Sequence, residues 1–255
     1  MISKDQIKSL ISLIKELGQE TEKIKKRDFD YELKSDGSPL TEADRYVNSQ
    51  LVNFISTTEC KNLISEEEKQ TPYHHRRNWE FYWVIDPIDG TKEFIKKGND
   101  YTINIALCKG HRPIFGLVSR PALSDIFYAI EGSGSKKNSK IISVRNFKKG
   151  DAIKLVASKS HLNKTTMDYI ENLKLKHKVE TINIGSSLKI CSVAEGESDL
   201  YPRFGPTCEW DTCAADIILM EAGGKILDRA GNFLNYNKKD FLNPEFIAYS
   251  CEELI

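Results

Sequence analysis

The sequence predicts a mixed α/β protein, and three observations support this fold class. Helical patterns open the chain, short apolar segments separated by turn residues fill its middle, and strand and helix patterns alternate toward its end. Apolar residues make up 40% of the 255 residues, which is enough for a substantial buried core. The length fits one large domain or two tightly packed halves, 1–150 and 151–255, with a soft boundary near Gly150.

The first half is predicted to begin with two helices and to continue as an antiparallel region. A helix is expected over residues 3–26, because apolar side chains recur on one face and Ser3 with Gln6 can form a capping box. A second helix is expected over 41–57. Apolar stretches between turn residues then predict strands over 82–85, 101–108, 113–120 and 125–130, followed by a polar hairpin tip over 132–140.

The second half alternates strands and helices, which is typical of an α/β arrangement. Strands are predicted over 153–158, 179–184, 200–203, 225–228 and 245–249. Helices are predicted over 162–173, 186–195 and 211–222, and the last of them meets a stop signal at Gly223 and Gly224. Nothing near residue 150 resembles a flexible linker, so we expect the two halves to pack closely.

The charge balance and the cysteines exclude several classes of protein. There are 37 basic and 37 acidic side chains and the formal net charge is zero, which argues against a strongly basic nucleic-acid binder. No apolar run approaches the roughly 18 residues that a membrane helix needs, and Lys8 with Lys15 interrupts any signal peptide. The six cysteines include no C-x-x-C pair, so we expect free thiols in a reducing cytoplasm rather than a zinc site.

No visible pattern fixes the oligomeric state, so a cytoplasmic monomer and a cytoplasmic homodimer are both expected, with a small molecule as the partner. No membrane anchor is visible in the sequence, and a peripheral position at the cytoplasmic face of the inner membrane is left open. The basic run at 74–77 is expected to be exposed surface.

The segment 83–94, WVIDPIDGTKEF, is the most informative stretch of the chain. An apolar strand ends at Asp86, and Pro87 restricts the backbone and favours a turn. Asp89 is a favourable residue for a helix N-cap, and Gly90 allows the backbone to pass close to a ligand. A helix that starts here would offer free backbone N–H groups, which attract anions such as phosphate.

Two aspartates at a helix start that also favours an anion create a conflict. Carboxylates about 4 Å apart repel by roughly 4 kcal/mol at an effective dielectric of 20. A hard divalent cation resolves it, since Asp86, Asp89 and the carbonyl of Ile88 can bind the cation while the helix start binds phosphate. The alternative interpretation is an ordinary turn capped by an aspartate.

Three further acidic segments could contribute to the same site, although each alone is more typical of a cap or an exposed surface. They are Glu66 to Glu68 after an apolar pair, Thr41, Glu42 and Asp44 at a helix start, and Asp211 after Trp210 at the start of an apolar helix. Their occurrence together in one chain favours the cation site.

In this order, the E-E, D-P-I-D-G-T and W-D elements resemble the inositol monophosphatase superfamily of metal-dependent, lithium-sensitive phosphomonoesterases. The resemblance spans about 36–249. Three segments resemble the CysQ branch, the 3′(2′),5′-bisphosphate nucleotidases. They are the motif T-K-E-F at 91–94, GSSLK at 185–189 and YPRFGPT at 201–207. The resemblance implies a five-layer α-β-α-β-α sandwich of the inositol monophosphatase and fructose-1,6-bisphosphatase type.

The resemblance also implies roles for individual residues. Glu66, Asp86, Ile88 through its carbonyl, Asp89 and Asp211 would bind two or three Mg²⁺ ions, and their hard oxygen donors suit that ion. Asp44 and Thr91 would activate the attacking water, with Glu67 behind the metal ligands. Gly90, Thr91 and Asp211 would contact the substrate at the reacting phosphate, while His161, Ser186, Lys189 and Arg203 would lie near the nucleotide.

The activity implied is hydrolysis of the 3′-phosphate of 3′-phosphoadenosine 5′-phosphate to AMP, in the nucleotide recycling of sulfur assimilation. Lys189 and Arg203 suit a 5′-phosphate. Each of these residues also has an alternative role that does not involve the nucleotide. His161 could cap a helix, Lys189 could be a solvated helix residue, and Arg203 could pair with a carboxylate. An inositol or other sugar phosphatase of the same superfamily is the alternative function, and a non-catalytic cation-binding module is the alternative class.

Overall fold

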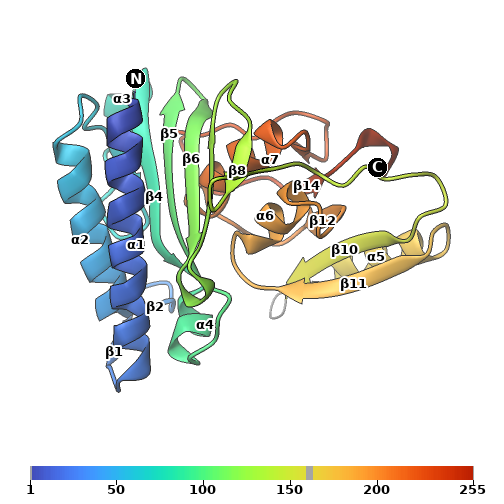
Figure 1. Ribbon diagram of the computed structural model, residues 1–255, viewed down its shortest axis with the longest axis horizontal. Coiled ribbons are helices and arrows are strands. Elements are labelled where there is room, and N and C mark those ends of the chain that lie inside the picture. Colours follow the sequence, from blue (N-terminus) through green and yellow to red (C-terminus); the bar gives the residue numbers. More distant parts are fainter. Residues whose placement is uncertain (1, 159–162, 255) are drawn as a thin grey trace.

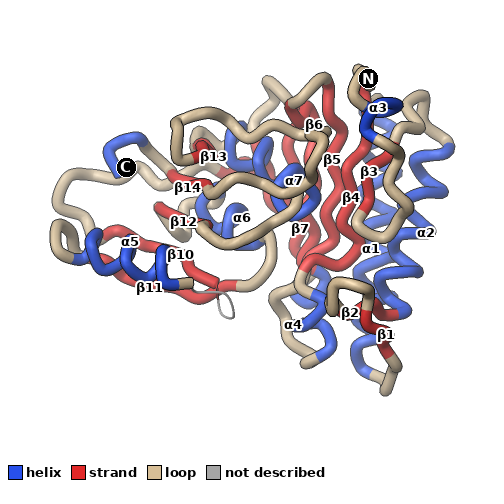
Figure 2. Tube along the Cα trace, turned by 180° about the vertical axis from the view of Figure 1, so that it is seen from behind, coloured by secondary structure: helices blue, strands red, loops and turns tan. Residues whose placement is uncertain are grey.

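The computed structural model describes residues 2–158 and 163–254 and places the chain in five layers (Figure 1). Two long helices form the first layer and a seven-stranded sheet the second. Two shorter helices lie between this sheet and a five-stranded sheet, and one further helix covers the outer face of the second sheet (Figures 1 and 2). The predicted α/β fold of five alternating layers is the observed one.

The first layer consists of α1 (Lys4–Lys26) and α2 (Glu42–Ser56), and both helices begin with a capping box. Ser3 and Gln6 exchange hydrogen bonds at the start of α1, as the sequence predicts. Thr41 and Asp44 do the same at the start of α2. Because the apolar faces of both helices pack on one side of the seven-stranded sheet, they form one core with it.

The seven-stranded sheet has its strands in chain order, and a two-stranded hairpin precedes it. The hairpin is β1 (Tyr31–Leu33) with β2 (Pro39–Thr41). The sheet comprises β3 (Leu63–Ser65), β4 (Phe81–Asp89), β5 (Thr102–Lys109), β6 (Arg112–Arg120), β7 (Asp125–Ile130), β8 (Ser135–Lys137) and β9 (Lys140–Ile142). β3 pairs with β4 in parallel, and every later pair is antiparallel.

The five-stranded sheet is mixed and follows the order β11-β10-β12-β14-β13. Its strands are β10 (Ile153–Ser158), β11 (Val179–Ile184), β12 (Leu200–Arg203), β13 (Lys225–Asp228) and β14 (Phe246–Tyr249). The helices of this half are α5 (Lys164–Lys174), α6 (Leu188–Ala194) and α7 (Glu209–Glu221). Short helices occur at α3 (Tyr73–Arg76) and α4 (Thr91–Ile95), with 3₁₀ turns at Pro121–Leu123 and Glu252–Leu254.

Helix α7 lies directly on the seven-stranded sheet and joins the two halves into a common core. At Gly116 on β6, a Cβ atom would lie 2.3 Å from the carbonyl oxygen of Ala214, so only glycine permits this approach. The helix that carries Asp211 is therefore held close to the strands that carry the D-P-I-D-G-T turn. A division into separate units at residue 150 remains a prediction.

Two expectations about the surface need correction. The segment 132–140 contains turns, as expected of a hairpin tip, but it also contributes β8 and the first residue of β9, because β8 pairs with both β7 and β9. Arg76, expected in an exposed basic run, is buried, where it donates to Asn237 and lies over the ring of Phe241. Within residues 2–158 and 163–254, no helix combines the length and apolar character that a membrane crossing requires.

Candidate active site

The two aspartates of the D-P-I-D-G-T turn lie on β4, where a bulge turns both toward the same face. Asp86 pairs with Asn104 of β5 and Asp89 pairs with Thr102, so β4 contains one residue more than its partner between these pairs. In a regular strand, residues three apart point to opposite faces. The extra residue places both carboxylates on the face shared by Asn104 and Thr102.

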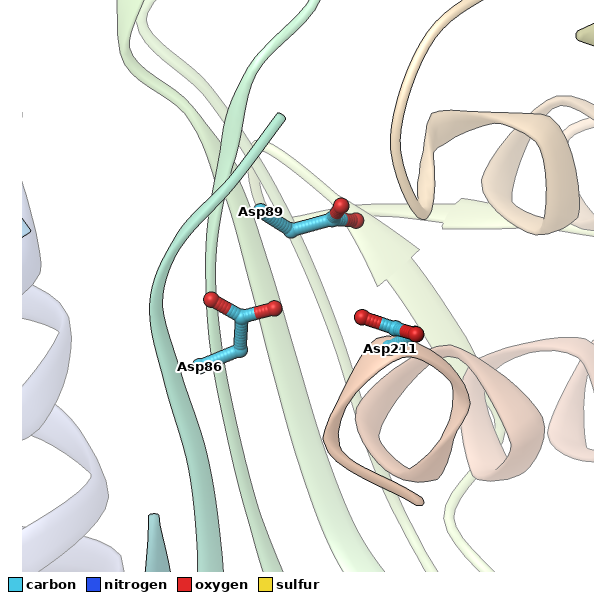
Figure 3. A group of neighbouring side chains, drawn as sticks. All are labelled: Asp86, Asp89 and Asp211. Carbon is cyan, nitrogen blue, oxygen red and sulfur yellow. The ribbon is translucent and has the colours of Figure 1, made fainter. Parts of the chain in front are cut away.

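Asp211 reaches the same point from α7. It is the third residue of that helix, and its Oδ2 accepts a 2.7 Å hydrogen bond from the backbone N–H of Cys208 at the N-cap. Oxygens of Asp86, Asp89 and Asp211 all lie within 4.8 Å of one another. The side chains converge on the space between β4 and the first turn of α7 (Figure 3).

The three neighbouring carboxylates together suit a cation. Asp86 is 1% exposed, and neither of its carboxylate oxygens has a hydrogen-bond partner among the described residues. Burial, followed by the charges of Glu66, Asp89 and Asp211, holds the pKa of Asp86 well above its ordinary value. An uncompensated buried carboxylate is unfavourable, and a set of carboxylate oxygens is what Mg²⁺ prefers. The donors present therefore fit the predicted divalent ion.

The predicted capping role of Asp89 is wrong. Gly90 is the N-cap of α4, in a left-handed conformation with φ of 92°, and no side chain caps this helix. The Asp89 carboxylate instead accepts a 2.6 Å hydrogen bond from the backbone N–H of Ser187. Burial raises the pKa of Asp89, and nearby Lys189 opposes that effect. Asp89 is thus free of the helix start and directed toward the loop before α6.

Thr91 and Asp44 meet across the layers, as predicted. The hydroxyl of Thr91 lies 3.4 Å from Oδ1 of Asp44 and 3.0 Å from the carbonyl oxygen of Ile88, and it can donate to either. The other oxygen of Asp44 accepts from the backbone and hydroxyl of Thr41. Burial raises the pKa of Asp44 to about 6, which is suitable for a group that takes up a proton near neutral pH.

A cavity of about 420 Å³ opens beside these groups, and its lining includes predicted residues from both halves of the chain. Asp89 and Asp211 lie in its lining and, with Asp86, form what we call the acidic wall. Lys189 and Arg203 also line the cavity and form the basic wall. The predicted substrate residues Gly90, Thr91 and Ser186 lie in the same lining.

The two cations of the basic wall are held differently. Lys189 is buried, and its Nζ donates a 2.6 Å hydrogen bond to the carbonyl oxygen of Ser186. Burial lowers its pKa to about 8, while Asp89 acts in the opposite direction. Arg203 is half-buried and donates to the carbonyl oxygen of Pro206, and its Nε has no partner among the described residues.

Comparison with known proteins identifies the family. The sequence profile described as the inositol monophosphatase family matches residues 4–254. The chain belongs to the inositol monophosphatase family. The predicted resemblance and the prediction of a phosphatase enzyme are thereby confirmed.

Within the family, similar proteins include two curated relatives and two solved structures. The 3′(2′),5′-bisphosphate nucleotidase CysQ of Salmonella typhimurium is 38% identical over 218 residues, covering 85% of this chain and 87% of the relative. The Escherichia coli K12 protein of the same name is 37% identical over 214 residues, covering 84% and 86%. The crystal structure of CysQ from Bacteroides thetaiotaomicron is 38% identical and covers 96% of this chain and 97% of its own, with a TM-score of 0.83. The Thermotoga maritima IMPase structure is 26% identical and covers 96% and 92%, with a TM-score of 0.81.

Glu66 and Glu67, the E-E element of the family pattern, lie beside the acidic wall rather than within it. Lys34 Nζ forms ion pairs of 2.7 Å with Glu66 and 2.5 Å with Glu67. Glu66 is still near enough for its charge to raise the pKa of Asp86. Burial raises the pKa of Glu67 to about 7, although Lys34 opposes this.

Sequence reasoning missed two residues of this site, and one predicted residue cannot be placed. Lys34 precedes the S-D-G turn between β1 and β2, and no local pattern pairs it with glutamates 32 and 33 residues later. Ser187 stands within the G-S-S-L-K segment, which drew attention to Ser186 and Lys189 instead. His161 lies outside the described residues.

Proposed function

We propose that the chain is a Mg²⁺-dependent phosphomonoesterase that hydrolyses the 3′-phosphate of 3′-phosphoadenosine 5′-phosphate, giving AMP and phosphate. The observation that carries this proposal is one cavity with a wall of three converging carboxylates, of which Asp86 is fully buried, and a second wall of two cations. A bisphosphate nucleotide needs both, because one phosphate reacts beside a cation site and the other requires positive charge. The names of the CysQ relatives support this substrate class.

Asp86, Asp89 and Asp211 would hold the metal, joined by Glu66 and the carbonyl oxygen of Ile88, and the family pattern favours two or three ions. When bound, Mg²⁺ supplies positive charge that offsets the charge of the phosphate oxygens and of the leaving 3′ oxygen. Lys34 pairs with only one carboxylate oxygen of Glu66, so the other oxygen would remain available to the ion. Glu67 also pairs with Lys34 and would help to hold that cation beside the site.

Thr91 and Asp44 would orient and deprotonate the attacking water. The Thr91 hydroxyl can accept a hydrogen bond from water and donate its own proton to Asp44, 3.4 Å away. Asp44, with a pKa of about 6, then provides the basic group that this relay needs. The water attacks phosphorus in line with the leaving oxygen, and no covalent enzyme intermediate forms.

The remaining residues of the cavity would hold the substrate. Backbone N–H groups of Gly90 and Thr91 donate to the reacting phosphate at the start of α4. Ser186 and Arg203 contact the nucleotide, with Arg203 directed at the 5′-phosphate because its planar guanidinium matches phosphate oxygens. Lys189 contributes charge from behind Ser186. The activity would serve nucleotide recycling during sulfur assimilation in the cytoplasm.

A panel of three substrates tests the proposal. Phosphate release is measured from 3′-phosphoadenosine 5′-phosphate, inositol 1-phosphate and fructose 1,6-bisphosphate, with Mg²⁺ and with EDTA. We expect the highest kcat/KM for the nucleotide, and no release in EDTA. A preference for inositol 1-phosphate or fructose 1,6-bisphosphate would replace the nucleotidase by a sugar phosphatase. Absence of metal-dependent release from all three would favour a non-catalytic cation-binding module.

A further inference from the structure

Asp100 lies between α4 and β5 and connects segments that are distant in sequence. It is 6% exposed. Its Oδ1 accepts a 2.8 Å hydrogen bond from Arg120 at the end of β6, and its Oδ2 accepts a 3.2 Å bond from the backbone N–H of Gly185. Arg120 also donates to the carbonyl oxygen of Asn99, so one guanidinium holds two successive residues. The carboxylate thus joins β6 to the loop that follows β11.

The loop 185–187, which we call the serine loop, forms part of the cavity lining. The N–H of Ser187 donates to Asp89 at 2.6 Å, and its hydroxyl lies 2.8 Å from that of Thr102 and 2.9 Å from Oδ1 of Asn104. Thr102 and Asn104 are the two residues opposite the aspartates in the bulge. The position of this loop therefore determines where the carboxylate of Asp89 points.

Ser186, in the middle of the serine loop, has the properties of a constrained ligand-binding residue. Its φ of 47° is uncommon for a residue with a side chain. Its hydroxyl is buried and has no partner among the described residues. A strained backbone and an unsatisfied hydroxyl persist only where surrounding contacts hold them. Asp100 provides one such contact through the adjacent Gly185.

The backbone of Asp100 also packs behind the turn at Gly90, which we call the phosphate turn. A Cβ atom at Gly90 would lie 3.1 Å from the Asp100 carbonyl oxygen and 3.5 Å from the Cβ of Ser186. A Cβ atom at Gly185 would lie 2.8 Å from both the Cβ and the carbonyl oxygen of Asp100. The serine loop therefore has no space for a methyl group against Asp100, and the phosphate turn packs tightly against the same residue.

We propose that Asp100 is a positioning residue, which sets the distance between the phosphate turn and the serine loop and thereby aligns Asp89 and Ser186 toward the cavity. The ion pair with Arg120 anchors Asp100 to the sheet, and its bond to Gly185 transmits this position to the loop. This role rests on the proposed function of the cavity. Asp100 acts through Gly185 and Ser187 and does not itself need to contact the substrate.

The test compares Asp100→Asn with a matched control, Asp199→Asn. Asp199 also accepts from an arginine, Arg145, at 2.8 Å and from a backbone N–H, that of Lys154, at 2.8 Å. Side-chain exposures of the two pairs are similar, 25% and 9% for Arg120 with Asp100 against 24% and 0% for Arg145 with Asp199. Asp199 is absent from the cavity lining, so it reproduces the loss of a buried ion pair without disturbing the serine loop.

Mg²⁺ binding by calorimetry and steady-state kinetics are measured for each folded variant. We expect Asp100→Asn to lower kcat/KM about ten- to a hundredfold, because small displacements of reacting groups have effects of that size, and to weaken Mg²⁺ binding through Asp89. Asp199→Asn should lower the melting temperature and leave both readouts at wild-type values. Wild-type Mg²⁺ binding and kinetics in folded Asp100→Asn, or an equal functional loss in Asp199→Asn, would overturn the positioning role.

Two further variants keep the test decisive if Asp100→Asn does not fold. Gly185→Ala displaces the serine loop without changing any charge, and Arg120→Lys keeps the cation but cannot hold Asn99 and Asp100 together. Both should show weaker Mg²⁺ binding, and wild-type Mg²⁺ binding in both would overturn the role. The Mg²⁺ titration needs no substrate, so it tests Asp100 even if the wild-type protein fails to hydrolyse the nucleotide, which would remove the proposed function instead.

Discussion

The acidic and basic walls of the cavity are built in different ways. The acidic wall arises from local devices, a one-residue bulge in β4 and a capping box at the start of α7, which direct Asp86, Asp89 and Asp211 to one point. The basic wall instead uses two long side chains, each of which donates a hydrogen bond to a carbonyl oxygen three residues away in the sequence. Lys189 donates to the carbonyl oxygen of Ser186, and Arg203 to that of Pro206. We infer that the first wall carries the chemistry of the family and the second carries substrate choice.

Lys189 shows where this division is not strict. It belongs to the basic wall by charge. Burial lowers its pKa to about 8, and the charge of Asp89 is the strongest of the charges that oppose this effect. Replacing it would disturb both walls. Arg203 is therefore the better probe of substrate recognition.

The largest effect is expected from Asp211→Asn, compared with Asp216→Asn on the same helix. Both aspartates belong to α7, Asp211 in its first turn and half-buried, Asp216 further along and buried. Asp216 pairs with Arg112 and lies outside the acidic wall. Asp211→Asn should lower kcat about a thousandfold, because bound metal supplies several kcal/mol of stabilisation and each 1.4 kcal/mol corresponds to a factor of ten.

Asp216→Asn should instead lower the melting temperature and keep kcat near the wild-type value. The two kcat values, measured at saturating Mg²⁺, check this prediction. If Asp211→Asn and Asp216→Asn had a similar kcat, a position in the acidic wall would make no difference to turnover. The acidic wall would then lose its assigned role.

Thr91→Val tests the proton relay and should have the next largest effect. Valine has nearly the shape of threonine but can neither accept a hydrogen bond from water nor donate to Asp44. We expect kcat to fall about a hundredfold, within the range for loss of general base assistance, while calorimetric Mg²⁺ binding stays unchanged. Weaker Mg²⁺ binding with an unchanged kcat would assign Thr91 to metal binding instead.

A smaller effect concerns stability as a function of pH. Burial raises the pKa of Asp44 to about 6 and those of Asp211 and Glu67 to about 7. Because the folded state binds these protons more tightly than the unfolded chain, their contribution is present at low pH and is lost as the pH rises from about 4 through 7. Without metal, the melting temperature should therefore fall between pH 5 and pH 8.

Added Mg²⁺ should counteract this loss, since it compensates the ionised carboxylates and binds only the folded site. The increase in melting temperature on adding Mg²⁺ should be several degrees larger at pH 8 than at pH 5, a shift that corresponds to about 1–2 kcal/mol for a chain of this size. An equal increase at both pH values would show that ionisation of the acidic wall is not coupled to metal binding.

The sequence predicts much of the fold where local patterns are strong. The strands over 125–130, 153–158 and 179–184 have their predicted bounds, and both N-terminal capping boxes form. The acidic wall could also be predicted, because its residues stand in short motifs. The N-cap role of Gly90 could not be predicted from the local sequence, because aspartate is a common N-cap residue. Asp89 does not cap the helix, since its carboxylate binds the backbone N–H of Ser187, 98 residues later.

The other failures have the same cause. Lys34 pairs with Glu66 and Glu67, and Arg76 is buried by residues of the last quarter of the chain. Such contacts depend on how distant segments meet, and no periodicity or spacing encodes them. For the same reason Asp100, which joins three segments, carries no signal in the sequence.

The central claim is that the acidic wall performs hydrolysis while the basic wall recognises the second phosphate. It is tested most directly by the ratio of kcat/KM for 3′-phosphoadenosine 5′-phosphate to that for adenosine 3′-phosphate, in wild type, in Arg203→Gln and in the control Arg229→Gln. Arg229 is a nearby arginine that lies over Phe204 and outside the cavity lining. We predict that Arg203→Gln lowers this ratio about tenfold or more, as expected for hydrogen bonds between charged groups, and that Arg229→Gln leaves it unchanged. An unchanged ratio in Arg203→Gln, with both substrates affected equally, would contradict the claim.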